Sequence, residues 1–291
     1  MPETPLLPGL ERLAERYETF IIDLWGVMHD GVTAFPAALD CLQRLKARGG
    51  ANVILSNAPR RASAVAARNA ELGIDPELVD LVMSSGEVTW RHLKDRPDRW
   101  YRVLGRRCHQ LGPARDLGMR EALGLDFVDD PAEADFILLT GPLGTRDRVE
   151  DYQDYLSAAL ARKLPMVCAN PDWEVIRDGR REICAGAIAK EYVRMGGDVR
   201  YHGKPDREIY DACLTPLGAV DRRRVLALGD SLRTDVAGAV GAGIDAVFVA
   251  GGIHATELGM DDGGDPNPAG LRKLIEGAAA RPLAVLSVLS W

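Results

Sequence analysis

Four short segments, each at the C-terminal end of a predicted strand, contain the side chains best suited to chemistry. FIIDLWGV places Asp23 after a hydrophobic run, and VILSNAPR places Ser56 in the same position. HGKPDREIY contains Lys204, and RVLALGDSLRTDV contains Asp230 and Asp235. A carboxylate can be a nucleophile or a metal ligand, and a carboxylate pair suits a hard cation with oxygen ligands. A hydroxyl and an ammonium group can bind anionic oxygens. Together these side chains predict anion and metal chemistry.

Each of these residues, taken alone, has an ordinary structural explanation. Asp23 fits a strand-to-helix turn, and Ser56-Asn57 fit a turn or a helix N-cap. Lys204 fits a solvated surface lysine, and Asp235 fits an N-cap beside its neighbouring threonine. Their shared position at strand ends favours a functional site, because ligands bind at the carboxyl edge of open α/β sheets.

The elements that must position these residues alternate between strand and helix. A helical pattern of apolar residues runs from Phe35 to Leu45 and ends at Gly49-Gly50. Short apolar runs predict strands buried on both faces, which is typical of a mostly parallel sheet in an α/β protein. The predicted strands are Phe20–Leu24, Asn52–Leu55, Phe136–Leu139, Met166–Cys168, Val225–Leu228 and Ala246–Val249.

The middle third of the chain has additional elements and several Gly and Pro breaks, from about Gly86 to Arg200. A single sheet rarely needs so long an insertion, so we expect a second module there. The predicted division is a core formed by residues 1–85 plus 201–291 and an α/β cap formed by residues 86–200.

The order Asp–Ser–Lys–Asp, in the contexts DLWGV, LSN, GKPD and GDSLRTD, resembles the four motifs of the haloacid dehalogenase (HAD) superfamily. The long insert before GKPD resembles subclass IIA, which has a large α/β cap and includes NagD-like sugar phosphatases and pyridoxal phosphate phosphatases. Asn170-Pro171-Asp172 and CAGAIAKEY strengthen this resemblance. It implies a Rossmann-like parallel-sheet core with an inserted α/β cap.

The resemblance also implies a mechanism, phosphate-monoester hydrolysis of a small phosphorylated metabolite. Asp23 attacks phosphorus and forms an aspartyl-phosphate, while Ser56 and Lys204 hold the non-bridging oxygens. The expected cofactor is Mg²⁺, and its implied ligands are Asp23, Asp230, Asp235 and the backbone carbonyl of Trp25.

Three further residues are expected to face the substrate. Asn57 follows Ser56, and Asp172 and Trp173 lie in the insert next to the Asn-Pro-Asp segment. The alternatives are a turn for Asn57, a cap of the following turn for Asp172, and packing in a core or interface for Trp173. No residue in the sequence identifies the substrate further.

Trp25 departs from the family pattern, because phosphatases of the superfamily usually have a general acid/base Asp two residues after the nucleophile. An indole cannot usefully exchange a proton at neutral pH. Four explanations are open: a substrate with a good leaving group, a proton from His29 or Asp30, phosphotransfer in place of hydrolysis, or loss of catalysis with retained phospholigand binding. Aromatic substitution here also occurs in metal-free dehalogenases, so dehalogenation is a minor alternative that the Asp230/Asp235 pair disfavours.

The composition of the chain excludes some classes of protein and some cellular locations. The chain has 291 residues, 46% of them hydrophobic, and a formal net charge of -7, which argues against general binding to nucleic acid or to a membrane surface. Its five scattered cysteines, the absence of a recognisable signal peptide and the lack of an apolar run of about 18 residues predict a cytoplasmic protein. The apolar run Leu283–Trp291 is expected to dock on the core or at a subunit interface, and a homodimer is compatible with the sequence.

Overall fold

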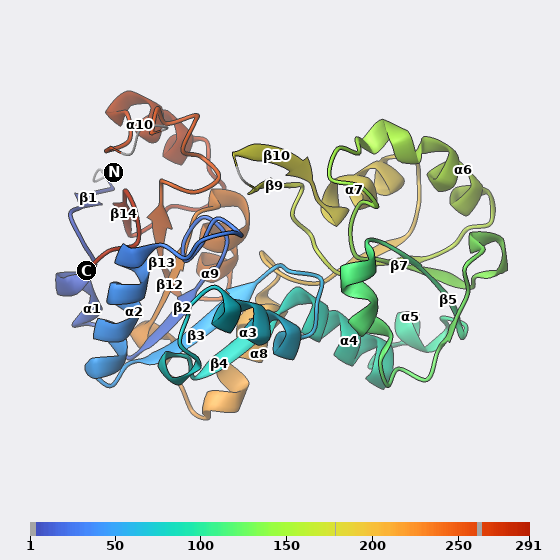
Figure 1. Cartoon of the computed structure of the whole chain (residues 1–291), viewed down its shortest axis with the longest axis horizontal. Helices are drawn as coiled ribbons and strands as arrows, with labels where there is room; N and C mark the ends of the chain where they lie inside the picture. Colours follow the sequence, from blue (N-terminus) through green and yellow to red (C-terminus); the bar gives the residue numbers. More distant parts are fainter. Residues whose placement is uncertain (1–3, 178, 261–263) are drawn as a thin grey trace.

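A computed structural model describes residues 4–177, 179–260 and 264–291. Two parallel sheets lie side by side along the long axis of the molecule (Figure 1). The larger sheet has the strand order β1-β14-β13-β12-β2-β3-β4, with every neighbouring pair parallel. Its strands are β1 (Leu6–Leu7), β2 (Thr19–Ile22), β3 (Ala51–Ser56), β4 (Leu81–Ser84), β12 (Val225–Gly229), β13 (Asp245–Val249) and β14 (Ala284–Leu286).

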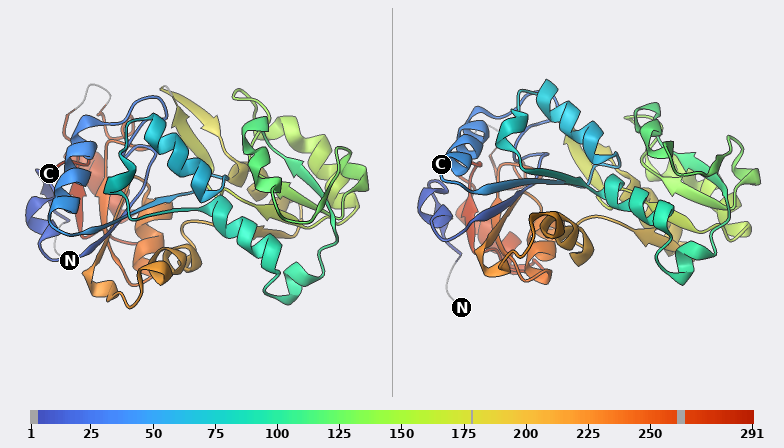
Figure 2. Two further views of the ribbon diagram at one scale, coloured as in Figure 1. Left: turned by 60° about the horizontal axis from the view of Figure 1, so that its bottom comes forward. Right: turned by 90° about the horizontal axis from the view of Figure 1, so that it is seen from below.

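Alternate residues of the central strands face opposite sides of this sheet, so both of its faces are buried. Phe20 and Ile22 pack with the first group of helices, whereas Ile21 packs with the second. Figure 2 shows the two helical layers on either side of the sheet. The first group is α1 (Glu11–Ala14), α2 (Pro36–Ala47) and α3 (Ala62–Glu71), and the second is α8 (Arg207–Leu214), α9 (Ala237–Gly241) and α10 (Pro268–Glu276).

The smaller sheet has the order β11-β8-β7-β5-β6 and is also parallel throughout. An antiparallel hairpin of β9 (Glu174–Arg177) and β10 (Arg180–Ile183) extends from this part of the chain toward the larger sheet (Figure 1). The strands of the smaller sheet are β5 (Arg107–Leu111), β6 (Asp126–Phe127), β7 (Phe136–Leu139), β8 (Met166–Cys168) and β11 (Val199–Tyr201). The helices with it are α4 (Ser85–Asp95), α5 (Arg99–Arg102), α6 (Gln153–Ala161) and α7 (Ala185–Arg194).

The chain passes between the two sheets twice. The first crossing leads from β4 directly into α4, where the hydroxyl of Ser84 accepts a hydrogen bond from the Glu87 N–H at 3.0 Å and caps the helix. The second crossing leads from β11 through His202, Gly203 and Lys204 into α8. We use the names core (residues 1–85 and 201–291) and cap (residues 86–200) for the two parts below; these boundaries remain those predicted from the sequence.

The predicted α/β fold with a parallel-sheet core is confirmed. Strands predicted at Phe136–Leu139 and Met166–Cys168 have the same bounds in the structure, and the other four differ by one or two residues at an end. The helical pattern from Phe35 corresponds to α2, which has Pro36 as its first residue. Within the described ranges, no helix is both long enough and apolar enough to span a bilayer.

Candidate active site

The order of the strands brings the predicted site residues to one edge of the larger sheet. β12, β2 and β3 are neighbours, and their carboxyl ends carry Asp230, Asp23 and Ser56. The Asp23 N–H still donates to the Leu228 carbonyl at 2.9 Å, which holds Asp23 in line with its strand. Parallel strands thus place groups from distant parts of the chain around one point.

Lys204 reaches this point from the second crossing. Its Nζ donates to Asp23 Oδ1 and to Asp235 Oδ1, both at 2.7 Å, and lies 3.4 Å from the Leu55 carbonyl. The lysine is 3% exposed. Burial alone would lower the pKa of Lys204, but the two carboxylates raise it well above its ordinary value. The ammonium group is therefore charged at neutral pH.

The buried carboxylates of Asp23, Asp230 and Asp235 have oxygens within 4.8 Å of one another. Burial raises the pKa of Asp23 to about 7, although Lys204 opposes that shift. Burial and the two neighbouring carboxylates raise the pKa of Asp230 well above its ordinary value. Three acidic groups around one lysine leave an excess of negative charge in a buried place, which fits a divalent cation with oxygen ligands.

Two glycines leave room for the Asp230 carboxylate. A Cβ added to Gly26 would lie 2.1 Å from Asp230 Oδ2, and one added to Gly252 would lie 2.0 Å from the same oxygen. The φ angle of Gly26 is +73°, a conformation that other residues rarely adopt. The Ile253 N–H donates to Oδ2 at 2.7 Å and fixes the orientation of the carboxylate. The chain is therefore shaped to hold this acidic group close to Asp23.

Asn57, which follows β3, links the core to the cap residue Asp172 and to the second crossing at Lys204. Its Nδ2 donates to Asp172 Oδ1 at 2.9 Å and to the Lys204 carbonyl at 3.1 Å, and its Oδ1 accepts from the Lys204 N–H at 2.7 Å. Both amide hydrogens of the side chain are used in these bonds. This geometry favours a role for Asn57 in positioning Lys204 and Asp172.

Trp25 is half-buried at the entrance to the site, and its ring contacts the His29 ring edge-on at 5.2 Å between centroids. His29 Nδ1 accepts the Gly31 N–H at 3.0 Å, and burial lowers the pKa of His29 to about 4. Asp30 Oδ1 accepts the N–H groups of Val32 and Thr33, at 2.8 and 2.7 Å. Burial would raise the pKa of Asp30, but these bonds outweigh it and lower the value. Neither side chain is a ready proton donor at neutral pH.

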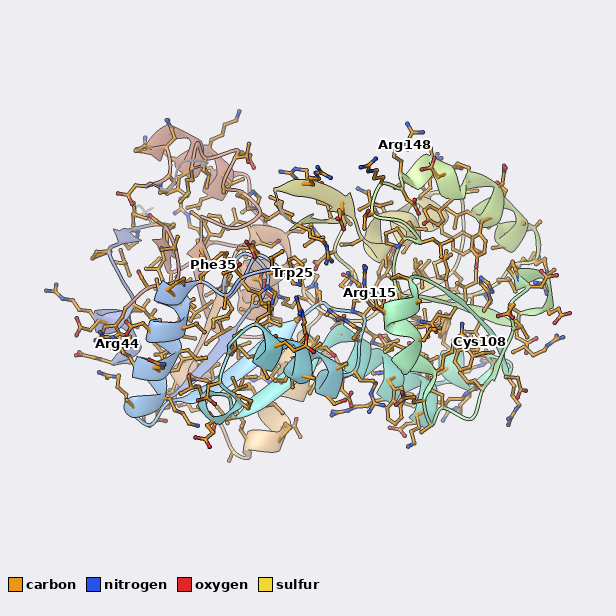
Figure 3. The ribbon with its side chains drawn as sticks, in the orientation of Figure 1. Trp25, Phe35, Arg44, Cys108, Arg115 and Arg148 are labelled. Atoms are coloured by element: carbon orange, nitrogen blue, oxygen red, sulfur yellow. The ribbon has the colours of Figure 1, made fainter. Side chains whose placement is uncertain are left out.

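A cleft of about 510 Å³ lies between core and cap and opens onto Asp23. Figure 3 shows Trp25 on the core and Arg115 on the cap, on either side of the space between the two parts. Asp172 and Trp173 both line the cleft, and Trp173 is 43% exposed. The guanidinium of Arg233, a core residue, lies 4.2 Å from the centroid of the Trp173 ring.

Five arginines that were not among the predicted site residues also line the cleft. They are Arg60, Arg115, Arg177, Arg181 and Arg233, whose charge suits an anionic ligand, and the acidic residues Asp116, Glu174 and Glu182 line the same cleft. Arg233 lies within the GDSLRTD segment, so its proximity to the site could have been inferred there. The positions of the cap arginines depend on how the cap docks on the core, which no local pattern encodes.

Comparison with known proteins identified two family models that match this chain. A model described as haloacid dehalogenase-like hydrolase matches residues 20–125, and a HAD-hydrolase-like model matches residues 201–276. The two matched segments contain the ends of β2, β3 and β12 and the connection with Lys204. All four motifs therefore lie in the matched regions.

Individual proteins are similar over most of their length. A crystal structure of a hydrolase of the haloacid dehalogenase-like family from Brucella suis 1330 superposes with a TM-score of 0.84 at 35% identity, covering 98% of this chain and 100% of the other. Chronophin from Bos taurus is 28% identical over 272 residues, 86% of each chain. Ribonucleotide monophosphatase NagD from Escherichia coli (strain K12) is 27% identical over 240 residues, 81% of this chain and 89% of the other.

Proposed function

This chain belongs to the haloacid dehalogenase-like hydrolase family, and from that premise we propose that it is a Mg²⁺-dependent phosphatase acting on a small phosphorylated metabolite. The observation that carries the proposal is the Asp23 carboxylate, held by Lys204 beside two further carboxylates and open to a cleft with five arginines.

In the first step, a carboxylate oxygen of Asp23 attacks phosphorus while the ester P–O bond breaks and its electron pair leaves with the substrate oxygen. Lys204 donates to Oδ1 of Asp23, which favours the ionised carboxylate against the effect of burial, and Asp23 lines the cleft that would receive the phosphate. Ser56 Oγ accepts the Ala58 N–H at 3.2 Å, so its own hydrogen is free for a non-bridging phosphoryl oxygen.

In the second step, water attacks phosphorus of the aspartyl-phosphate and the bond to the Asp23 oxygen breaks. Inorganic phosphate leaves, and the carboxylate returns to its starting state. The residues that would hold Mg²⁺ are Asp23, Asp230, Asp235 and Trp25, the last through its backbone carbonyl. When bound, the ion neutralises the charge between phosphate and carboxylate.

Trp25 restricts the substrates that fit this scheme. A positioned acid usually protonates the departing oxygen, and its absence lowers rates by about 10²–10⁴-fold when the leaving group is basic. We therefore propose an acyl, aryl or other phosphate whose leaving group departs without prior protonation. Transfer of the phosphoryl group to an acceptor other than water is compatible with the same site.

The decisive experiment measures phosphate release from an aryl phosphate and an alkyl phosphate, with Mg²⁺ and with EDTA. We expect turnover of the aryl phosphate that requires Mg²⁺ and is abolished in Asp23→Asn. Turnover no greater than that of Asp23→Asn would rule out the phosphatase.

The second candidate function is phospholigand binding without turnover, and Trp25 is the observation that favours it. A wild-type protein that binds phosphate esters with Mg²⁺ but forms no phosphoenzyme with acetyl phosphate would support this candidate. Halide release from a haloacid, unaffected by chelator, would instead support dehalogenation.

A further inference from the structure

A second cluster of metal-ligating side chains lies outside the cleft, at the junction of core and cap. It consists of His92 on α4, His202 on the second crossing and Glu208 on α8, and we call these three residues the junction cluster. One ligand atom from each lies within 4.8 Å of the other two. The active-site mechanism uses none of them.

The Glu208 carboxylate is shared between the two imidazoles. Oε1 lies 2.9 Å from His92 Nε2, and Oε2 lies 3.6 Å from His202 Nδ1. The second distance is too long for a hydrogen bond. The two imidazole rings lie side by side, with 4.2 Å between their centroids.

The partner of His92 Nδ1 determines which nitrogen of that ring faces the carboxylate with a lone pair. His92 Nδ1 lies 3.0 Å from the Val88 carbonyl, which can only accept, so Nδ1 carries the hydrogen. In the neutral imidazole, Nε2 then directs its lone pair at Glu208. His202 Nε2 contacts the Tyr101 hydroxyl, and its Nδ1 is fully buried without a hydrogen-bond partner. An unpaired buried nitrogen is costly unless something binds it.

We propose that the junction cluster binds a transition-metal dication of the zinc type through His92 Nε2, His202 Nδ1 and a Glu208 oxygen. Two imidazoles and a carboxylate are a ligand set that Zn²⁺ accepts, with water in the remaining position. The half-exposed side chain of Glu208 leaves a path for the ion and that water. The Val88 carbonyl and the Tyr101 hydroxyl orient the two rings from outside the ligand set.

A protonated His92 explains fewer of the contacts in the junction cluster than a bound metal ion does. An imidazolium at His92 would satisfy the 2.9 Å contact with Glu208, but it would leave His202 Nδ1 without a partner. A metal ion satisfies both nitrogens and the carboxylate at once. The ligand types also separate this site from the all-oxygen cluster around Asp23, because Mg²⁺ prefers oxygen ligands and imidazole suits zinc.

The cluster would fasten both crossings of the chain. His92 belongs to the cap, Glu208 belongs to the core, and His202 lies between β11 and Lys204. A bound ion would therefore stabilise the relative position of the two parts. All five cysteines are buried, so they do not compete for zinc on the surface of the folded protein.

Zinc binding is tested on the full chain, stripped with EDTA and titrated with Zn²⁺ against a chromogenic chelator in excess Mg²⁺. We expect one tightly bound Zn²⁺ per chain in the wild type and in Asp230→Asn. His202→Ala and Glu208→Gln should weaken binding by more than about 10²-fold, since even partners outside a ligand set change affinity by about 10–100-fold. His254→Ala is the matched control, because His254 pairs with Glu257 at the cleft and lies outside the junction cluster.

A second measurement does not depend on the histidine variant folding normally. Zn²⁺ should raise the Tm of the wild type and leave that of Glu208→Gln unchanged. Co²⁺ bound at the site should show visible absorption typical of four-coordinate geometry in the wild type, and this absorption should be lost in Glu208→Gln. A wild type that binds no equivalent of zinc, or a Glu208→Gln variant that binds it as tightly, would overturn the proposal.

Discussion

A single ammonium group holds two of the three carboxylates at the bottom of the cleft. Lys204 donates to Asp23 and Asp235 from a position that is 3% exposed, so removal of its charge would leave buried anions without compensation. Removing one partner of a buried ion pair is strongly destabilising, because the remaining charge keeps its desolvation cost. The arrangement that positions the proposed nucleophile Asp23 is therefore also a determinant of stability.

Lys204→Met should lower the free energy of unfolding by about 3–5 kcal/mol in EDTA. Mg²⁺ should recover part of that loss, since a divalent cation compensates the same carboxylates. Urea unfolding with and without Mg²⁺ measures both effects. Lys190→Met is the control: its exposed ammonium lies 3.8 Å from the Trp173 ring centroid, so the loss should stay below about 1 kcal/mol. An equal decrease in the free energy of unfolding in Lys204→Met and Lys190→Met would show that the buried charge of Lys204 does not stabilise the fold.

Trp25→Asp should increase kcat for an alkyl phosphate by about 10²–10⁴-fold, because it restores a proton donor where the family has one. The gain should be much smaller for an aryl phosphate, whose leaving group needs no proton. Steady-state kinetics with both substrates tests this difference. Trp25→Phe removes the indole without adding an acid and should give no gain. A comparable gain in that variant would show that the smaller side chain, and not the added acid, increases kcat.

The chemistry-bearing residues could be predicted because they lie within short motifs at strand ends. Asp23, Ser56, Lys204, Asp230 and Asp235 all reach one edge of the sheet, as expected from the alternation of strands and helices. The motifs do not reveal which hydrogen bonds these side chains form in the folded protein. The amide of Asn57, expected at the substrate, is bonded to Asp172 and Lys204, and only the docking of the cap on the core determines those contacts.

Among the elements, helix α4 depends on one buried acid at its first turn. Glu87 accepts bonds from Arg61 at 2.7 Å and from the Ala62 N–H at 3.2 Å, which joins the start of α4 to the start of α3. Burial would raise the pKa of Glu87, but these bonds outweigh it and lower the value. The charged form of Glu87 therefore stabilises the connection between core and cap.

Glu87→Gln should destabilise the protein by about 1.5–3 kcal/mol at neutral pH, the range for hydrogen bonds to a charged group. A lowered folded pKa contributes stability that is present above the unfolded value of 4.5 and is lost as pH falls through the folded value. The difference between variant and wild type should thus shrink below pH 4.5. Glu71→Gln, which removes an exposed pair with Arg68, should change stability by less than about 0.5 kcal/mol at every pH. A difference that grows at low pH would contradict this assignment.

The predicted strands are those with apolar side chains at most positions, although the edge strand β4 (Leu81–Ser84), which is also largely apolar, was not among them. The strand β5 (Arg107–Leu111) was missed, since its sequence RCHQL is largely polar. The strand β14 was recognised only as an apolar run expected to dock, and in the structure it pairs with β1 and β13. Pairing partners far apart in sequence decide such short strands, and a local pattern does not contain that information.

At the scale of the whole molecule, Arg233 connects core and cap across the cleft. Its guanidinium stacks on Trp173 at 4.2 Å, lies 3.7 Å from Asp172 Oδ1 and donates to the Pro171 carbonyl at 3.4 Å. These contacts hold the Asn-Pro-Asp segment over the site. We expect these contacts to help exclude water from a bound substrate by holding the cap on the core.

Arg233→Ala should raise KM for an aryl phosphate by about 5–30-fold, corresponding to about 1–2 kcal/mol for a cation–π contact with a charged hydrogen bond. Hydrogen exchange in residues 170–176 should also become faster. Steady-state kinetics and exchange mass spectrometry test the two effects together. Arg48→Ala removes a similar stack on Trp291, far from the cleft, and should change neither quantity. An unchanged KM in Arg233→Ala would show that the contact plays no part in substrate binding.

Only His202 and Gly203 separate the last strand of the smaller sheet from Lys204, and this closeness limits how freely the two parts can be recombined. A chimera that receives the cap of another family member has to retain its own residues from His202 through Lys204, together with the Ser84–Ser85 junction. If the chimera were joined within residues 202–204, the contact between Lys204 and Asp23 would change together with the substrate preference. We therefore expect sequence differences between family members to lie mainly inside the cap, and the two crossings between core and cap to vary less.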